Sequence, residues 1–94
     1  MQSHARLTTD RGARYMIQLA KHWSHKFAVE SDERQARIPL GAATLRMDAG
    51  AEGLDLVIEA ADEETLVRLE QVVADHLTRF SFREPDLTLA WSRA

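Results

Sequence analysis

Histidine is the residue type in this sequence best suited to chemistry, and three of the four histidines fall in two segments with helical spacing. His22 and His25 lie three residues apart near the end of the first segment, and His76 lies in the second. Residues three apart on a helix share one face, and histidine is the commonest metal ligand. His22, His25 and His76 are therefore a candidate site for a divalent metal. Glu30 or Asp75 could supply a further ligand.

A structural role competes with metal binding at these positions. The three histidines fall in the last turns of their predicted helices, where the helix dipole favours a cationic or polar side chain. His76 also lies on the apolar stripe of its helix, between Val73 and Phe80, as expected of a hydrogen-bonded structural histidine. If each connection reverses the chain direction, the two helices run in opposite directions. His76 then lies far from His22 and His25, so we favour the structural interpretation.

Other groups with chemical potential are weaker candidates. Arg11 and Arg14 near the start of the first helix could hold a phosphate or carboxylate, but a solvated helix face is favoured. Trp23 and Trp91 fit core positions better than an aromatic platform. There is no cysteine and no glycine-rich phosphate loop, since all four glycines but Gly12 fall at predicted turns. The sequence therefore favours a protein that is not an enzyme, while an enzyme with a histidine general base stays open.

The period of the apolar residues predicts the elements that position these side chains. Alternation predicts strands over 5–8, 27–30, 35–40, 43–48, 54–59 and 87–91, and helical spacing predicts helices over 11–25 and 62–80. Thr9 or Asp10 is expected to cap the first helix, and Asp62 the second. Pro39 lacks an amide hydrogen, which indicates an edge strand or a bulge.

One-sided alternation is typical of an antiparallel sheet with one solvated face. The predicted fold class is α+β, with two helices packed on one face of a single antiparallel sheet. The element order is strand, helix, four strands, helix, strand, in a single domain spanning residues 1–94. On the solvated face we expect cross-strand charge pairs among Arg37, Arg46, Asp55 and Glu59.

Composition narrows the possible partners and location. No apolar stretch is long enough to span a bilayer, and residues 1–6 lack the apolar core of a secretory signal. The absence of cysteine fits a reducing cytoplasm, so we expect a cytoplasmic protein. Residues 1–47 carry eight Arg or Lys and four Asp or Glu, whereas residues 48–94 carry four and eleven. The basic residues are dispersed, so we expect the two halves to pair with each other and expect no nucleic-acid partner.

The sequence also contains a set of residues that resembles a known family. The set is Arg14-Tyr15, Leu19, His22-x-x-His25-Lys26, Gly41, Leu45, Ala60-x-Asp62, His76-Leu77-x-Arg79-Phe80-x-Phe82-Arg83-Glu84 and Trp91. It resembles the small bacterial proteins catalogued as domain of unknown function 2218, over nearly the whole chain. The resemblance implies a compact α+β domain, similar to the arrangement of helices on a curved antiparallel sheet in TATA-binding protein. The family has no established activity, although a link of some relatives to siderophore-interacting proteins implies iron handling.

Three functions remain as hypotheses. The leading one is a small, non-enzymatic, cytoplasmic domain that binds a protein partner or a small ligand. The first alternative is a metal-binding module with His22 and His25 as first-choice ligands and His76 as a further candidate, linked to iron or siderophore handling. The second is the small enzyme named above. Lys26, Arg79 and Arg83 are a candidate ligand or partner surface. Exposed strand edges leave both a monomer and a homodimer open.

Overall fold

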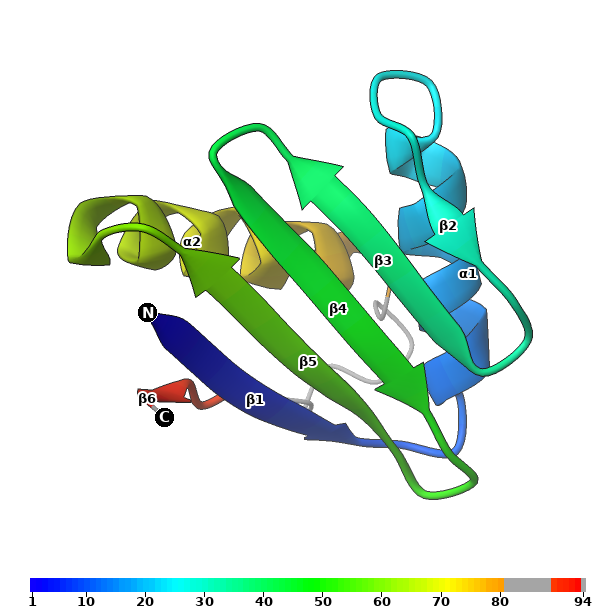
Figure 1. The fold of residues 1–94 in the computed structure, drawn as a ribbon. Coiled ribbons are helices and arrows are strands. Elements are labelled where there is room, and N and C mark those ends of the chain that lie inside the picture. The colour runs from blue at the N-terminus through cyan, green and yellow to red at the C-terminus, as the bar shows by residue number, and fades with distance from the viewer. Residues whose placement is uncertain (81–88, 94) are drawn as a thin grey trace.

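Two helices cover one face of a single antiparallel sheet (Figure 1), as the alternation of apolar residues predicts. The computed structural model describes residues 1–80 and 89–93. The strands are β1 (Gln2–Thr8), β2 (Glu30–Ser31), β3 (Gln35–Leu40), β4 (Ala43–Ala49), β5 (Gly53–Ala60) and β6 (Ser92–Arg93), and the helices are α1 (Gly12–Trp23) and α2 (Glu63–Phe80). The sheet order is β2-β3-β4-β5-β1-β6. The predicted α+β class and element order are confirmed.

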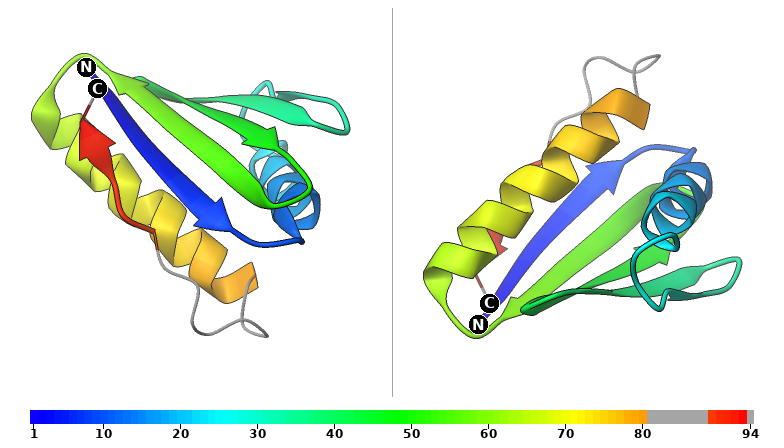
Figure 2. Two further views of the ribbon diagram at one scale, coloured as in Figure 1. Left: turned by 90° about the horizontal axis from the view of Figure 1, so that it is seen from below. Right: turned by 90° about the horizontal axis from the view of Figure 1, so that it is seen from above.

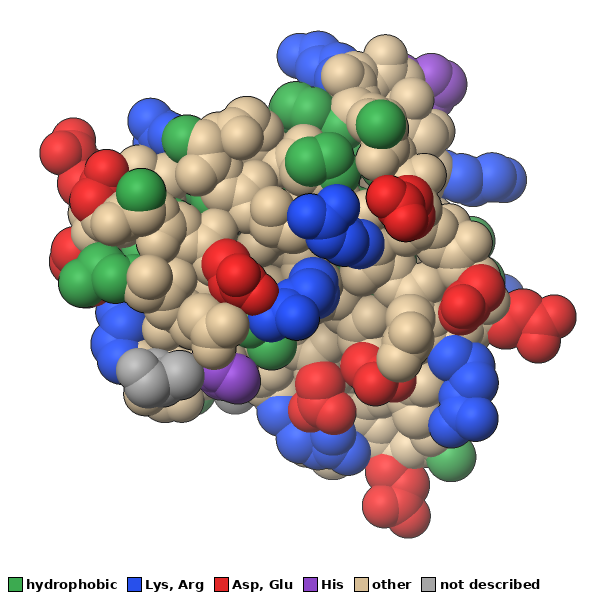
Figure 3. All heavy atoms as spheres, viewed as in Figure 1, with side chains coloured by type: hydrophobic (Ala, Val, Ile, Leu, Met, Phe, Trp, Pro, Cys, Tyr) green, Lys and Arg blue, Asp and Glu red, His purple; other side chains and the backbone are tan. Residues whose placement is uncertain are grey.

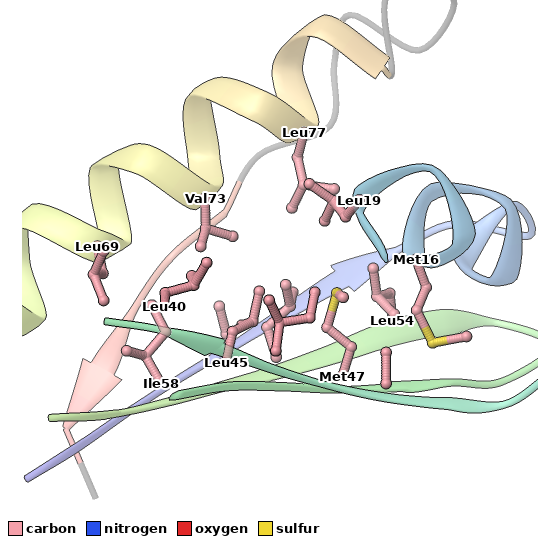
Figure 4. Close-up of a cluster of buried hydrophobic side chains, with 14 of the residues drawn as sticks. Met16, Leu19, Leu40, Leu45, Met47, Leu54, Ile58, Leu69, Val73 and Leu77 are labelled. Carbon is pink, nitrogen blue, oxygen red and sulfur yellow. The ribbon is translucent and has the colours of Figure 1, made fainter. Parts of the chain in front are cut away.

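The core lies between the sheet and the two helices (Figure 4). The inward residues of the strands, such as Leu45, Leu56 and Ile58, are fully buried. The helices bury Leu19 and Val73 against them. Full burial of an aliphatic side chain of this size contributes roughly 1.5–3 kcal/mol, so this layer is the main source of stability.

The opposite face of the sheet is charged (Figure 3). Arg6 Nη1 lies 2.7 Å from Asp55 Oδ1, and Arg46 pairs with Glu59. Both of these pairs join the basic first half of the chain to the acidic second half, as expected. A further predicted residue, Arg37, faces β2 instead, where its Nη1 lies 3.9 Å from Glu30 Oε1.

Strand β3 lies near one edge of the sheet, which explains the tolerance of Pro39. Strand β2 pairs only with Arg37 and Ala36, so it does not reach Pro39, which faces Thr44 of β4. The missing amide hydrogen therefore leaves the ladder between β2 and β3 intact. This agrees with the expected edge position.

The two helices begin in different ways. Asp62 Oδ1 accepts the Thr65 backbone N–H at 2.7 Å, which confirms the predicted cap of α2. The expectation that Thr9 or Asp10 caps α1 is wrong, because the N-cap residue is Arg11 and makes no side-chain capping bond. The Thr9 N–H donates to the Glu52 carbonyl at 3.1 Å, so this residue still belongs to the strand connection. Its hydroxyl instead accepts the Arg11 N–H at 3.1 Å.

A close approach between α1 and β5 fixes the start of the first helix. A Cβ atom placed on Gly12 would lie 2.8 Å from the Gly53 carbonyl oxygen and 3.3 Å from Leu54 Cβ. No real side chain tolerates the first of these distances. Glycine is therefore the residue that lets the helix begin directly on the sheet.

Two predicted strands are shorter than expected or displaced. Phe27 and Val29 are half-buried against the core but lie outside the sheet, and β2 begins only at Glu30. In the described part of the predicted strand over 87–91, Leu89 and Trp91 pack against the core without pairing, and β6 lies at 92–93. Residues 87 and 88 lie outside the described residues. In both places the apolar alternation reflects burial and not strand pairing.

The region that the structure describes contains no helix long and apolar enough to cross a membrane.

Candidate functional site

The structure brings His22 and His76 into direct contact. Their Nε2 atoms lie 3.2 Å apart, and their ring centroids are separated by 4.8 Å. The prediction that His76 lies far from His22 is therefore wrong. It assumed antiparallel helices, whereas α1 and α2 cross (Figures 1 and 2). Leu19 of α1 and Leu77 of α2 point toward one another (Figure 4), and this packing brings the neighbouring histidines together.

The backbone of α2 fixes the position of one proton on His76. His76 Nδ1 lies 2.7 Å from the Val72 carbonyl oxygen, one helical turn earlier. A carbonyl only accepts, so Nδ1 carries the proton and donates it. A neutral His76 ring then presents the lone pair of Nε2, and His22 Nε2–H donates to it. His76 thus has the predicted structural hydrogen bond and still offers one nitrogen atom to a ligand.

The histidine pair lies in an open groove with mainly apolar walls. The Trp23 ring centroid is 4.9 Å from that of His76, and Trp23 is only 6 % exposed. His22 is exposed and His76 is half-buried. The groove has a volume of about 580 Å³, and its lining comprises His22, Trp23, His25, Lys26, Phe27, Leu40, Leu69, Val72 and His76. The imidazole nitrogens of His22 and His76 are therefore polar groups within a mainly apolar groove.

His25 lines the same groove but does not join the pair. Helix α1 ends at Trp23, and the N–H of the C-cap residue Ser24 donates to the Ala20 carbonyl at 2.9 Å. His25 follows this end, so it is no longer held on the helix face of His22. Among residues 1–80 and 89–93, no three His, Cys, Asp or Glu side chains gather closely enough to hold a metal ion. In the structure His22 contacts His76, and metal binding by His22 with His25 stays a prediction.

The two acidic candidates are used elsewhere. Asp75 Oδ1 accepts a hydrogen bond from the Gln71 side-chain amide at 2.8 Å on the surface of α2. Glu30 lies in β2 near Arg37. Neither residue belongs to the groove lining.

The predicted cationic surface is only partly at this site. Lys26 lines the groove, and its side chain is exposed. Arg79 is exposed in the last turn of α2 but is not part of the lining. Arg83 lies outside the described residues.

A second polar cluster joins β6 to α2 and β1. Arg93 donates twice to Glu63, with Nε–Oε2 at 3.1 Å and Nη2–Oε1 at 2.6 Å, and it also contacts Glu70. Its Nη1 donates to the Ser3 hydroxyl at 3.1 Å, and that hydroxyl donates to Glu70. The hydrogen bonds from Arg93 lower the pKa of Glu63, and those to Glu63 and Glu70 raise the pKa of Arg93.

Sequence reasoning missed this cluster, although one signal was present. Ser3 precedes Ala5 and Leu7 at the alternate, inward positions of β1, and it is fully buried. A polar residue on an apolar strand face requires a hydrogen-bond partner. The cluster is saturated, because no buried side-chain nitrogen or oxygen among the described residues lacks a partner. We therefore assign it a structural role and take the histidine groove as the candidate functional site.

Comparison with known proteins supports the fold. Over residues 4–92 the chain matches the family described as "Uncharacterized protein conserved in bacteria (DUF2218)". It is also similar to the NMR structure of PA4090 from Pseudomonas aeruginosa, with 34 % sequence identity and a TM-score of 0.82. That match covers 99 % of this chain and 96 % of the other. No curated protein matches the chain.

Proposed function

The chain belongs to the DUF2218 family of uncharacterised bacterial proteins, and we propose that it is a non-enzymatic binding domain whose groove holds a divalent transition metal. His22 and His76 are the proposed ligands, each through Nε2. The observation that carries the proposal is the 3.2 Å separation of these two atoms. His25, which sequence spacing made a first-choice ligand with His22, is not one of the proposed ligands.

The separation fits two ligands of one ion. Zinc binds imidazole nitrogen at about 2.0–2.1 Å, and two such nitrogens in a tetrahedral sphere lie about 3.3 Å apart. His22 and His76 already have nearly this spacing. Binding would require the proton on His22 Nε2 to move to Nδ1, without net proton release from a neutral pair. The spacing of the two nitrogens then needs little change, and each ring must turn so that its Nε2 lone pair points at the ion.

The hydrogen bond from His76 to the Val72 carbonyl adds independent support. A metal-bound histidine usually donates its other ring N–H to a carbonyl or carboxylate, which fixes the ring and its tautomer. His76 has this arrangement, with an Nδ1–O distance of 2.7 Å. Imidazole ligands suit zinc, copper and nickel better than magnesium or calcium. Iron handling stays a hypothesis, which an iron(II) titration addresses.

The groove favours binding over catalysis. Apart from the histidines and Lys26, the described residues that line it are apolar or aromatic side chains. They offer no carboxylate or hydroxyl to complete an acid–base or nucleophilic arrangement with His22 or His76. The proposal includes a cytoplasmic location. It keeps a protein partner and a small ligand as the two alternatives for what the domain binds.

The direct test is calorimetric titration of the untagged, chelator-treated chain with zinc, copper, nickel and, without oxygen, iron(II). We expect micromolar or tighter binding of zinc, copper or nickel. His22→Ala should weaken binding at least about tenfold, because it removes one of only two ligands. His22 is exposed, so this variant should keep the wild-type melting temperature without metal.

Two control variants separate this site from general binding by surface histidines. His4 is exposed on β1, and His4→Ala should leave metal affinity unchanged. His25→Ala should also have little effect, because His25 does not contact the pair. Equal binding by wild type and His22→Ala would reject the proposal, and the groove would then be tested against protein partners.

A further inference from the structure

We propose that the metal joins two copies of this chain, with His22 and His76 of each copy filling one tetrahedral coordination sphere. This inference rests on the proposed metal-binding function. It names the partner at the same site, which is a second copy of the chain. The metal-bound protein is then a symmetric dimer.

The described residues of each chain supply half of a closed zinc site. Among residues 1–80 and 89–93, no third His, Cys, Asp or Glu stands close enough to the pair to complete a site. Structural zinc is almost always bound by four protein ligands in a tetrahedron. Two nitrogens 3.2 Å apart occupy one edge of such a tetrahedron. A second copy offers the matching edge, with the same two nitrogens already placed.

The position of the pair gives a second copy access to it. His22 is exposed in the last turn of α1, and the groove around it is open. His76 is held by its bond to Val72, so the second copy does not need to order that ring. A two-fold axis through the metal would place the same groove of both copies face to face, the commonest symmetry of soluble homo-oligomers. The apolar walls around Trp23 and Phe27 would then lie at the contact.

Charge should prevent the same contact without metal. Lys26 lines the groove. A two-fold axis brings the Lys26 side chains of the two copies to the same contact, and each chain also carries a net charge of −3. Both terms oppose association of the metal-free chains. The dimer should therefore depend on the ion.

The test measures mass and zinc content together on the untagged chain. Sedimentation velocity is run on chelator-treated protein at several concentrations while zinc chloride is added. We expect a monomer without zinc and a dimer that saturates at one zinc ion per two chains. The apparent zinc affinity should rise with protein concentration. His22→Ala should abolish the zinc-dependent dimer, and His4→Ala should retain it.

The remaining outcomes separate the two proposals. A monomer that binds one zinc ion with wild-type His22 overturns the dimer but supports metal binding. A dimer that persists after chelation, or that survives in His22→Ala, also overturns the bridged dimer. Absence of zinc, copper and nickel binding at any protein concentration overturns both proposals.

Discussion

The Ser3 hydroxyl accepts a hydrogen bond from Arg93 Nη1 at 3.1 Å, although the two residues lie 90 positions apart in the sequence. This contact joins the last strand to the strand that begins the fold. Among the described residues, strand β6 pairs with β1 at two positions, Ser3–Arg93 and His4–Ser92. Its attachment therefore depends on side chains, and above all on Arg93.

We expect Arg93→Ala to lower the melting temperature and to detach β6. The change removes both hydrogen bonds to Glu63 and leaves Ser3 and Glu70 without their cationic partner. Hydrogen exchange should show faster exchange of the Ser92 amide. Arg93→Lys should recover only part of the loss, since lysine cannot form the paired contact with one carboxylate.

Arg14→Ala is the matched control for that variant, because Arg14 is an exposed arginine on α1. Its melting curve should follow the wild type. If Arg93→Ala and Arg14→Ala melt alike, the side-chain network does not hold β6.

Gly12→Ala should destabilise the protein, although alanine is the better helix former by about 1 kcal/mol. The new Cβ would meet the Gly53 carbonyl oxygen at 2.8 Å, so α1 would have to move away from β5. Urea unfolding should show a lower midpoint. Gly50→Ala is the control, because its Cβ would meet its nearest atom at 3.9 Å. A stabilised Gly12→Ala would show that the contact is not tight in solution.

Acid should weaken α2 through its cap. The backbone and hydroxyl hydrogen bonds from Thr65 lower the pKa of Asp62 below its ordinary value of 3.8. A carboxylate with a lowered folded-state pKa stabilises the fold fully above its unfolded-state pKa. That stability is lost as the pH falls through the folded-state pKa, so the loss occurs below about pH 4 to 5. A series of melting temperatures measured from pH 7 to pH 2 should therefore decrease over this pH range.

Asp62→Asn isolates the contribution of the cap. Asparagine also caps helices, so the variant should melt near the wild type at neutral pH. Below pH 5 its melting temperature should fall less steeply, because the amide does not titrate. Parallel pH curves for the two proteins would mean that other carboxylates account for the acid sensitivity.

His76→Ala should destabilise the metal-free protein by about 1 kcal/mol, because it removes the bond to Val72 and the contact with Trp23. Chemical unfolding in the presence of a chelator measures this effect. His22→Ala should cost much less under the same conditions, since His22 is exposed. An unchanged unfolding midpoint for His76→Ala would leave His76 without a structural role.

Local patterns were enough to predict most of the fold. Alternation along β3, β4 and β5 and the apolar stripes of both helices are properties of short segments, because each strand or helix buries one face. Asp62 could be assigned as a cap for the same reason. The patterns wrongly predicted strands where apolar side chains are buried without strand pairing, as at Phe27, Val29 and Trp91.

The candidate site could be predicted only in part. His22 and His76 were both named as candidate ligands, but the expected helix directions placed them far apart, because their contact depends on how the helices cross. That crossing is set by the packing of side chains such as Leu19 and Leu77, which no spacing within one helix encodes. The hydrogen bonds of Arg93 could not be predicted for a related reason, since its partners lie on α2 and β1.

The position of β1 in the sheet has a consequence for biosynthesis. β1 is hydrogen-bonded to β5 and β6, and the nearer of these begins at Gly53. A nascent chain that has released β1, α1 and the hairpin of β3 and β4 from the ribosome therefore still lacks every strand that pairs with β1. Ser3 and Leu7 stay open to water or to chaperones until translation supplies β5. The contacts that close the long loop between β1 and β5 should form slowly, and a ribosome stalled before residue 53 should carry a chain in which β1 is unpaired.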